Sequence, residues 1–439
     1  MGASGSTKPS TKDMTKKTIG PIVRRLMPRV VAKHLYRRMA LKYIADLEIP
    51  VDRERKTILV LNHFYDQDVR ALRRANKDYN VVSIHTPTLF KGAKIFFRED
   101  VQAMNAPYSD EDPANLAEYR KECERIFDAL KQKFGAHLMV TAADNFYWIR
   151  ELIDVARSQG VKTLFVDKEG LLSPYTFESD ARRIRENAPY ISDHLFVWSE
   201  RQKQFWMKTG VPEQDITILG QLRSDLFRQE MTFVVDGYFG AKRPLITFFT
   251  YEDDAYVPLN LVASEGLSWK DMKIKTQDLL AEIADAHPEY NFVFKAHPQQ
   301  SDLDALQLRY DRPNLKVIGG ASIANELIVR SELIVAFQTT AVLEAMFMNK
   351  RLIYTAWDPS VERLSDQILP FDKAPGVVVA KSYEHFKQVC ERFFSGNASD
   401  FAFSDEEEDR KHAMVSEYFY KPNGHVCERF FTEIGRFMA

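Results

Sequence analysis

Two short stretches in the second half of the chain carry side chains that can bind and neutralise a phosphate. Lys295 and His297 stand two residues apart at the end of an apolar run, and Pro298 ends strand pairing there and fixes the turn. Thr339 and Thr340 lie where another apolar run changes to a helical pattern. A helix start presents unpaired N–H groups and the positive end of its dipole. The pattern therefore predicts a phosphate site, with a simple helix cap at Thr339 as the alternative.

A carboxylate one helical turn later can complete a nucleotide site. Glu344 follows Thr340 by four residues, which places both on the same face of the expected helix. Acidic residues in nucleotide sites accept hydrogen bonds from ribose hydroxyls. We therefore expect the nucleotide phosphate at Lys295, His297 and the two threonines, and the ribose at Glu344.

The first half of the chain offers a carboxylate for acid–base chemistry. The strand pattern Val161–Asp167 is followed directly by Lys168, Glu169 and Gly170. A carboxylate at a strand end that faces a cleft can remove a proton from a hydroxyl, and a glycine lets the backbone pass close to a substrate. We expect Glu169 to be this general base, with Asp167 as a substitute. A loop glutamate held in a salt bridge is the alternative interpretation.

A second acidic pair, Asp253 and Asp254, follows the first apolar run of the second half. We interpret it as part of a cleft loop that contacts the acceptor or a nucleotide base, with a metal site as the less favoured alternative. Because cationic and hydroxyl groups already suit the phosphate, we predict a site that needs no metal and no cofactor.

These residues are positioned by elements that alternate between strand and helix patterns. The first half has expected strands at Thr57–Phe64, Val81–Thr86, His137–Ala142, Val161–Asp167, His194–Ser199 and Asp215–Gly220, and helices at Asp66–Asn76, Ala114–Phe134 and Phe146–Gln159. The second half has expected strands at Pro244–Thr250, Asn291–Lys295, Leu315–Gly320, Leu333–Phe337, Arg351–Ala356 and Gly376–Ala380, and helices at Trp269–His287, Ile323–Arg330, Tyr383–Phe394, Asp405–Tyr420 and Val426–Phe437. This alternation predicts an α/β protein with two parallel, Rossmann-like sheets.

The length of 439 residues suits two domains that face each other across a cleft, with ligands at the carboxyl ends of the strands. Residues 228–243 break the alternation and contain Gly237 and Gly240, so we place the boundary there. The expected parts are a basic N-terminal arm or helix (1–50), an acceptor domain (51–235) and a donor domain with terminal helices (236–439).

Composition excludes several classes of protein. A net charge of −2 gives no general reason to bind nucleic acid, and no apolar run has the length of a membrane-spanning helix. The three cysteines, Cys123, Cys390 and Cys427, are widely separated, which argues against a disulfide framework or a structural zinc site. We therefore expect a cytoplasmic protein.

The start of the chain departs from this balance of charge. Basic residues between Lys8 and Lys42 face a single acid, Asp13, and from Ile19 to Tyr43 they alternate with apolar residues. This pattern is typical of an amphipathic helix on an anionic membrane surface, here the inner face of the membrane. A solvated helix packed on its own domain is the alternative.

Several of these motifs together resemble a known family. The segment Phe292–Pro298, the Thr339–Thr340 pair before a helix and the segment Tyr420–Gly424 before the last helix resemble capsule polysaccharide glycosyltransferases of the GT-B fold. That group includes bacterial sialyltransferases, polysialyltransferases and capsule Kdo transferases, which use CMP-activated sugars. Its marks are an acidic-acidic-Gly motif that supplies the base, an HP motif and a Ser/Thr pair.

Glu169-Gly170 matches the last two positions of the acidic-acidic-Gly motif, but Lys168 stands where the motif has its first acidic residue. His297-Pro298 matches the second mark, and the threonine pair the third. The resemblance implies transfer of a Kdo or sialic-acid type sugar from a CMP-activated donor to a glycan or lipid-linked glycan acceptor. The HP and Ser/Thr marks also resemble CDP-glycerol and CDP-ribitol phosphotransferases, and a catalytically silent glycan- or nucleotide-binding protein is the third alternative.

Overall fold

The computed structural model describes residues 29–63, 65–168, 170–228, 233–255, 257, 261–262, 265–297, 300, 302–320 and 323–438. Glu169, Pro298 and the first part of the basic arm, residues 1–28, lie outside the described residues. Predictions that concern them therefore remain predictions.

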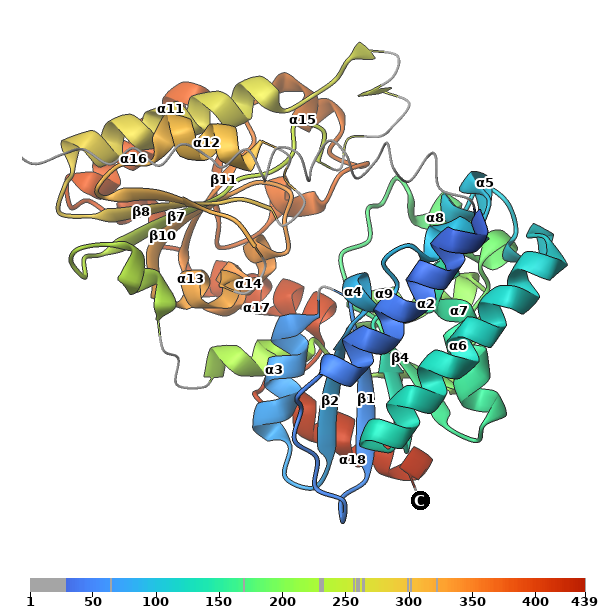
Figure 1. Ribbon diagram of the computed structural model, residues 1–439. Helices are drawn as coiled ribbons and strands as arrows, with labels where there is room; N and C mark the ends of the chain where they lie inside the picture. Colours follow the sequence, from blue (N-terminus) through green and yellow to red (C-terminus); the bar gives the residue numbers. More distant parts are fainter. Residues whose placement is uncertain are drawn as a thin grey trace, which may run out of the picture.

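Two parallel six-stranded sheets form the framework (Figure 1). The first has the order β2-β1-β3-β4-β5-β6, with strands at β1 Thr57–Asn62, β2 Asn80–His85, β3 Leu138–Thr141, β4 Lys162–Val166, β5 His194–Val197 and β6 Ile216–Ile218. The second has the order β12-β11-β10-β7-β8-β9, with strands at β7 Leu245–Phe249, β8 Asn291–Lys295, β9 Leu315–Ile318, β10 Ser331–Ala336, β11 Arg351–Thr355 and β12 Val378–Ala380. The predicted fold class, two Rossmann-like domains of the GT-B type, is confirmed.

Helices cover both faces of each sheet, so the central strands are buried throughout. On the second sheet, α11, α12 and α16 lie on one face and α13, α14 and α17 on the other (Figure 1). The helices of the first part are α2 Arg29–Asp46, α3 Asp66–Ala75, α4 Thr86–Leu89, α5 Glu99–Gln102, α6 Pro113–Phe134, α7 Tyr147–Ser158, α8 Phe177–Asn187 and α9 Glu200–Lys208. Those of the second part are α11 Lys270–Ala286, α12 Leu303–Tyr310, α13 Ala324–Arg330, α14 Ala341–Phe347, α15 Pro359–Arg363, α16 Tyr383–Phe394, α17 Asp405–Phe419 and α18 Val426–Met438.

Each sheet has one point where the strand order reverses. In the first sheet the chain runs from β1 to β2 on one side and then returns to β3 on the other side of β1. In the second sheet the reversal lies between β7 and β10. Connections leave such a point toward opposite faces of the sheet, which opens a crevice at the carboxyl ends of the strands. The two crevices are therefore the places where the topology favours a ligand.

The last helix ties the end of the chain to the first sheet. The apolar side of α18 lies in the core cluster that contains residues of β1, β3 and β4. Its start is held by Asp225, whose carboxylate accepts hydrogen bonds from the backbone N–H groups of Val426 (3.1 Å) and Cys427 (2.8 Å). Although α18 follows the second sheet in the chain, it belongs by packing to the first.

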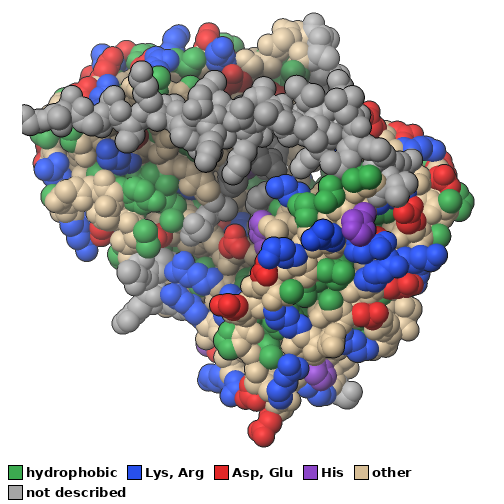
Figure 2. Space-filling model, viewed as in Figure 1, with side chains coloured by type: hydrophobic (Ala, Val, Ile, Leu, Met, Phe, Trp, Pro, Cys, Tyr) green, Lys and Arg blue, Asp and Glu red, His purple; other side chains and the backbone are tan. Residues whose placement is uncertain are grey.

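Helix α2 has one buried and one exposed side. Tyr36, Ala40 and Ile44 are buried in the core of the first domain. The opposite side exposes 45% of Val31, 38% of Leu35 and 47% of Met39, and Figure 2 shows apolar, histidine and basic side chains gathered over this helix. No helix in the described part of the chain is long and apolar enough to cross a membrane.

Candidate functional site

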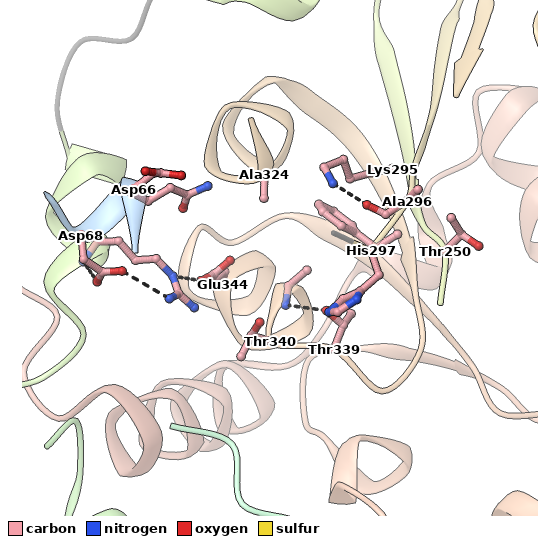
Figure 3. Close-up of a pocket in the computed structure, with 14 residues that line it drawn as sticks. Asp66, Asp68, Thr250, Lys295, Ala296, His297, Ala324, Thr339, Thr340 and Glu344 are labelled. Carbon is pink, nitrogen blue, oxygen red and sulfur yellow. Dashed lines mark hydrogen bonds and ion pairs between the residues drawn. The ribbon is translucent and has the colours of Figure 1, made fainter. Parts of the chain in front are cut away.

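A cavity of about 190 Å³ lies between the two domains, and its walls come from both (Figure 3). The second domain contributes the ends of β7, β8 and β10 with the adjoining starts of α13 and α14, and the first domain contributes the start of α3 and the segment after β6. The described residues that line it are Asp66, Gln67, Asp68, Arg223, Phe249, Thr250, Lys295, Ala296, His297, Ala324, Thr339, Thr340, Ala341 and Glu344.

The cavity lies where the topology favours a ligand. Thr250 follows β7 and Thr339 follows β10, the two strands that flank the reversal point of the second sheet. Asp66 follows β1, at the reversal point of the first sheet. The crevices of the two sheets thus face each other across one cavity. It contains five of the residues that the sequence pointed to, namely Lys295, His297, Thr339, Thr340 and Glu344.

Lys295 is a buried cation at the end of β8. Its side chain is 3% exposed, and its Nζ donates a hydrogen bond to the carbonyl oxygen of Ala296 at 2.5 Å. Burial disfavours the charged amine and lowers the pKa of Lys295 to about 8. The amine still carries its proton in most molecules at pH 7, so a bound anion would meet a poorly solvated positive charge.

His297 is exposed and stands in a fixed turn after the same strand. Its backbone N–H donates to Gln300 Oε1 (3.1 Å), and its carbonyl oxygen accepts from the backbone N–H of Gln300 (3.0 Å). Gln300 was not among the residues that the sequence pointed to. The buried side chain of Gln300 thus sets the backbone of the turn in which His297 lines the cavity.

The turn before α14 is held by Gln338, which also carried no signal in the sequence. Its φ of 45° lies in the left-handed region, which is uncommon for a residue with a side chain. Its buried amide compensates by donating to the Tyr354 hydroxyl (2.6 Å) and the Leu369 carbonyl (2.9 Å) and by accepting from the Leu369 N–H (3.0 Å). These three hydrogen bonds fix the turn that presents Thr339 and Thr340 to the cavity.

The two threonines do little to cap α14. Thr339 Oγ1 accepts from the N–H of Ala341 at 3.4 Å, close to the upper limit for a hydrogen bond, and Thr340 makes no side-chain cap. Both side chains are partly exposed and line the cavity. Helix capping alone is therefore a weak reason for the threonine pair.

Glu344 lies in the cavity wall but is part of a buried network of charges. Its Oε1 accepts from Arg223 Nε (3.0 Å) and Gln221 Nε2 (3.1 Å). Arg223 also approaches Asp68, with Nη1 3.6 Å from Oδ2, and its guanidinium lies 5.0 Å from the ring centre of Trp198. The side chains of Asp68, Arg223 and Glu344 are 3%, 16% and 5% exposed. Arg223 thus bridges acids of the two domains, and the ribose contact of Glu344 remains a prediction.

Two of the first half's predicted site residues have local structural roles. Asp167 is buried and its Oδ2 accepts a hydrogen bond from Trp206 Nε1 at 2.6 Å. A Cβ atom on Gly170 would lie 1.7 Å from Trp198 Cε3, so the absence of a side chain at this position lets the indole pack against the backbone. Neither residue is among the described residues that line the cavity.

The acidic pair of the second half also lies apart from the cavity lining. Asp253 Oδ1 is 2.5 Å from Lys273 Nζ, and Asp254 is exposed. Across the part of the chain that the structure describes, no group of three or more His, Cys, Asp or Glu side chains is arranged to hold a metal ion.

Comparison with known proteins adds support for the fold. No protein-family model matches the chain, and no curated protein matches its sequence. Among solved structures, a variant of the wall teichoic acid polymerase TagF is similar with a TM-score of 0.52 and 10% identity over 97% of this chain and 96% of that chain. A TagF variant soaked with CDPG has a TM-score of 0.49 and 11% identity over 98% of both chains. UDP-GlcNAc 2-epimerase from Neisseria meningitidis bound to UDP-GlcNAc has a TM-score of 0.48 and 13% identity over 87% of this chain and all of that chain.

Proposed function

We propose that this protein is a glycosyltransferase that binds a nucleotide-activated donor between its two domains and transfers the activated group to an acceptor hydroxyl. The observation that supports this most directly is the convergence of Lys295, His297, Thr339 and Thr340 on one interdomain cavity. These groups come from two different strand ends and share the ability to bind a phosphate. Their charge and hydrogen bonds would stabilise the negative charge that develops on the departing nucleotide phosphate.

The donor we propose is a CMP-activated acidic sugar of the Kdo or sialic-acid type, as the sequence resemblance implies. The acceptor would be a surface glycan or lipid-linked glycan. A CDP-glycerol or CDP-ribitol phosphotransferase is the second candidate, supported by the fold similarity to TagF. In that case the same groups would hold the donor, but the acceptor oxygen would attack phosphorus instead of a sugar carbon.

A thermal-shift panel of CMP, CDP, UDP and GDP tests the donor class. A nucleotide that binds only the folded protein stabilises it by about 2.7 kcal/mol at 100 times its Kd, so the order of the shifts ranks the nucleotides. We expect CMP and CDP to give the largest shifts. A larger shift with UDP or GDP would contradict the cytidine donor.

Turnover assays then separate the candidates. Release of CMP from CMP-sialic acid or CMP-Kdo is the expected result. Turnover of CDP-glycerol or CDP-ribitol, with none of either CMP-sugar, would identify a polyol phosphotransferase. Nucleotide binding without turnover of any of the four donors would identify a catalytically silent protein.

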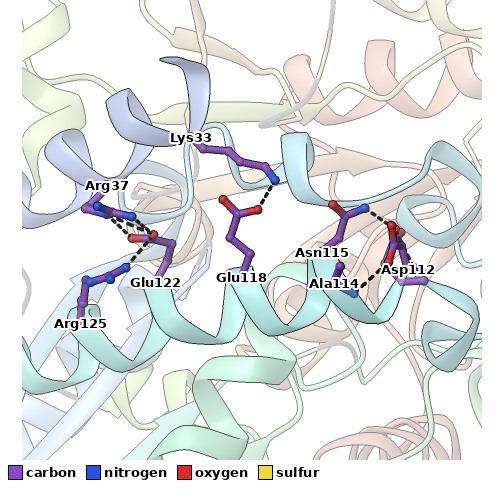
Figure 4. Close-up of polar contacts among 9 residues, drawn as sticks. Lys33, Arg37, Asp112, Ala114, Asn115, Glu118, Glu122 and Arg125 are labelled. Carbon is purple, nitrogen blue, oxygen red and sulfur yellow. Dashed lines mark hydrogen bonds and ion pairs between the residues drawn. The ribbon is translucent and has the colours of Figure 1, made fainter. Parts of the chain in front are cut away.

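We also propose that α2 places the protein on an anionic membrane, where lipid-linked acceptors lie. The helix is fixed to α6 by ion pairs from its inner side (Figure 4). Lys33 pairs with Glu118, and Arg37 Nε donates to Glu122 Oε2 at 2.8 Å. These two cations are therefore neutralised within the protein.

The outer side of α2 has the composition of a membrane-contact surface. Val31, Leu35 and Met39 follow one another at intervals of four residues and form an exposed apolar stripe. Exposed His34, Arg38 and Lys42 flank this stripe. Apolar side chains can enter the headgroup region while the cations attract anionic lipids. The inner-membrane location predicted from the sequence is thus attributed to this side of α2.

A further inference from the structure

One carboxylate on the first-domain wall of the cavity is placed to act on an acceptor. Asp66 is the first residue of α3 and follows β1, at the reversal point of the first sheet. Figure 3 shows Asp66 and Lys295 on opposite sides of the cavity, with Ala324 between them in this view. A molecule in the cavity can therefore face Asp66 with one end and the phosphate-binding groups with the other.

The Asp66 carboxylate is both accessible and oriented. The residue is exposed, and its Oδ1 accepts a hydrogen bond from Asn62 Nδ2 at 2.6 Å. Asn62 is itself fixed, because it is buried at the end of β1 and its Oδ1 accepts from the N–H of Tyr65 at 2.8 Å. One carboxylate oxygen is thus anchored to the sheet. Among the described residues, no side chain forms an ion pair with Asp66.

The other two carboxylates among the described lining residues are already bound within the protein. Asp68 is buried and its Oδ1 accepts from the backbone N–H of Arg223 at 3.1 Å, while the guanidinium of Arg223 lies nearby. Glu344 is bound by Arg223 and Gln221. Both are committed to the interdomain network, whereas a base must be reachable by its substrate. Accessibility and orientation together distinguish Asp66 from the other two carboxylates that the structure describes in this cavity.

We propose that Asp66 is the general base that activates the acceptor, an inference that rests on the proposed transferase function. The acceptor hydroxyl gives its proton to the Asp66 carboxylate as its oxygen forms a bond to the anomeric carbon of the donor. The bond from that carbon to the phosphate oxygen breaks, and the electron pair leaves with the nucleoside phosphate. Asp66 then releases the proton to solvent. With a CDP-polyol donor the same base would serve an attack on phosphorus.

The test compares Asp66→Asn with the wild type and with two matched variants. Asp405→Asn changes another exposed aspartate, which is the first residue of helix α17 and is not among the described residues that line the cavity. This variant controls for the stabilising effect of an acidic residue at the start of a helix. Glu169→Gln changes the base predicted from the sequence. The first assay measures the release of nucleotide from four donors: CMP-sialic acid, CMP-Kdo, CDP-glycerol and CDP-ribitol. The acceptors are labelled lactoside, sialoside and glycerol phosphate. The second assay measures the thermal shift caused by CMP and by CDP.

We expect Asp66→Asn to lower kcat by at least about 100-fold, the usual range for loss of a general base. The thermal shift by nucleotide and the activity of Asp405→Asn should stay at wild-type values. A smaller loss in Asp66→Asn, a lost nucleotide shift, or a loss of at least this size in Glu169→Gln would overturn the assignment of Asp66 and leave the proposed transferase function standing. Absence of turnover by the wild-type protein with every donor would overturn both.

Discussion

Replacing Arg223 with methionine should strongly destabilise the protein. Arg223 lies between Asp68 and Glu344, whose side chains are 3% and 5% exposed, so its removal leaves two buried carboxylates without their shared cation. Breaking a buried ion pair by removing one partner costs about 3–5 kcal/mol. Unfolding entropy of about 2.1 cal/mol/K per residue gives about 0.9 kcal/mol/K for one cooperative unit of 439 residues. The expected fall in melting temperature is therefore about 3–5 °C.

The pH dependence of this loss provides a sharper test than its size. Burial already raises the pKa of Asp68, and Arg223 opposes that effect. Without Arg223 the pKa should rise further, so the folded state holds more protons than the unfolded state above pH 3.8. Stability then falls as pH rises through this window, and Arg223→Met should lose more stability at pH 8 than at pH 5.

Neutral partners should restore part of the stability. The triple variant Asp68→Asn, Arg223→Met, Glu344→Gln has no buried charge left unpaired, so its melting temperature at pH 8 should exceed that of Arg223→Met. Melting curves of the three proteins at both pH values provide the measurement. A fall below about 1 °C for Arg223→Met, or the same fall at pH 5 and pH 8, would refute the description of this network as a buried bridge of charges.

Three further predictions concern Lys295, Gly170 and the exposed side of α2. Lys295→Met should lower the affinity for CMP, measured by titration calorimetry, at least about tenfold, because one charge-assisted hydrogen bond is worth about 1.5–3 kcal/mol. The affinity of the wild-type protein should decline as pH rises past the Lys295 pKa of about 8. Equal affinities of the variant and the wild type would show that Lys295 is not part of the donor site. Gly170→Ala should lower the free energy of unfolding in urea by about 1–3 kcal/mol, because the added methyl group meets Trp198. Gly240→Ala is the neutral control, because no atom beyond its own chain neighbours lies within 4 Å of the added Cβ. Leu35→Glu with Met39→Glu should abolish sedimentation with phosphatidylserine vesicles, and binding at the wild-type level would contradict the membrane role of α2.

The vesicle experiment uses point variants because of how α2 packs. Deleting residues 1–42 would also remove Tyr36 and Ala40, which are buried in the first core. Lost binding after such a deletion would then report unfolding as readily as loss of a membrane contact. Leu35 and Met39 are exposed, so changing them leaves that core intact.

Much of the architecture could be predicted from the sequence, because the periodicity of apolar residues is a local property. Continuous apolar runs gave buried strands, and patterns such as Ala114–Phe134 gave helices with bounds close to those observed. The gathering of Lys295, His297 and the threonine pair also followed, since the carboxyl ends of parallel strands lie on one edge of a sheet. Shorter, highly charged helices such as α8 and α9 gave too weak a pattern to be recognised.

Only the tertiary structure decided which groups meet across the cavity. Arg223 and Glu344 are 121 positions apart and Asp68 is farther from both, so no local pattern joins them. The return of α18 to the first sheet and the approach of Trp198 to Gly170 are likewise long-range packing events. The local sequence determines whether a segment forms a helix or a strand. The order of the strands determines which residues come to lie beside a buried charge or a glycine. Lys295, His297 and the threonine pair, which we predict to bind phosphate, were therefore visible in the sequence, while Asp66, Gln338 and the Arg223 bridge became visible only in the folded chain.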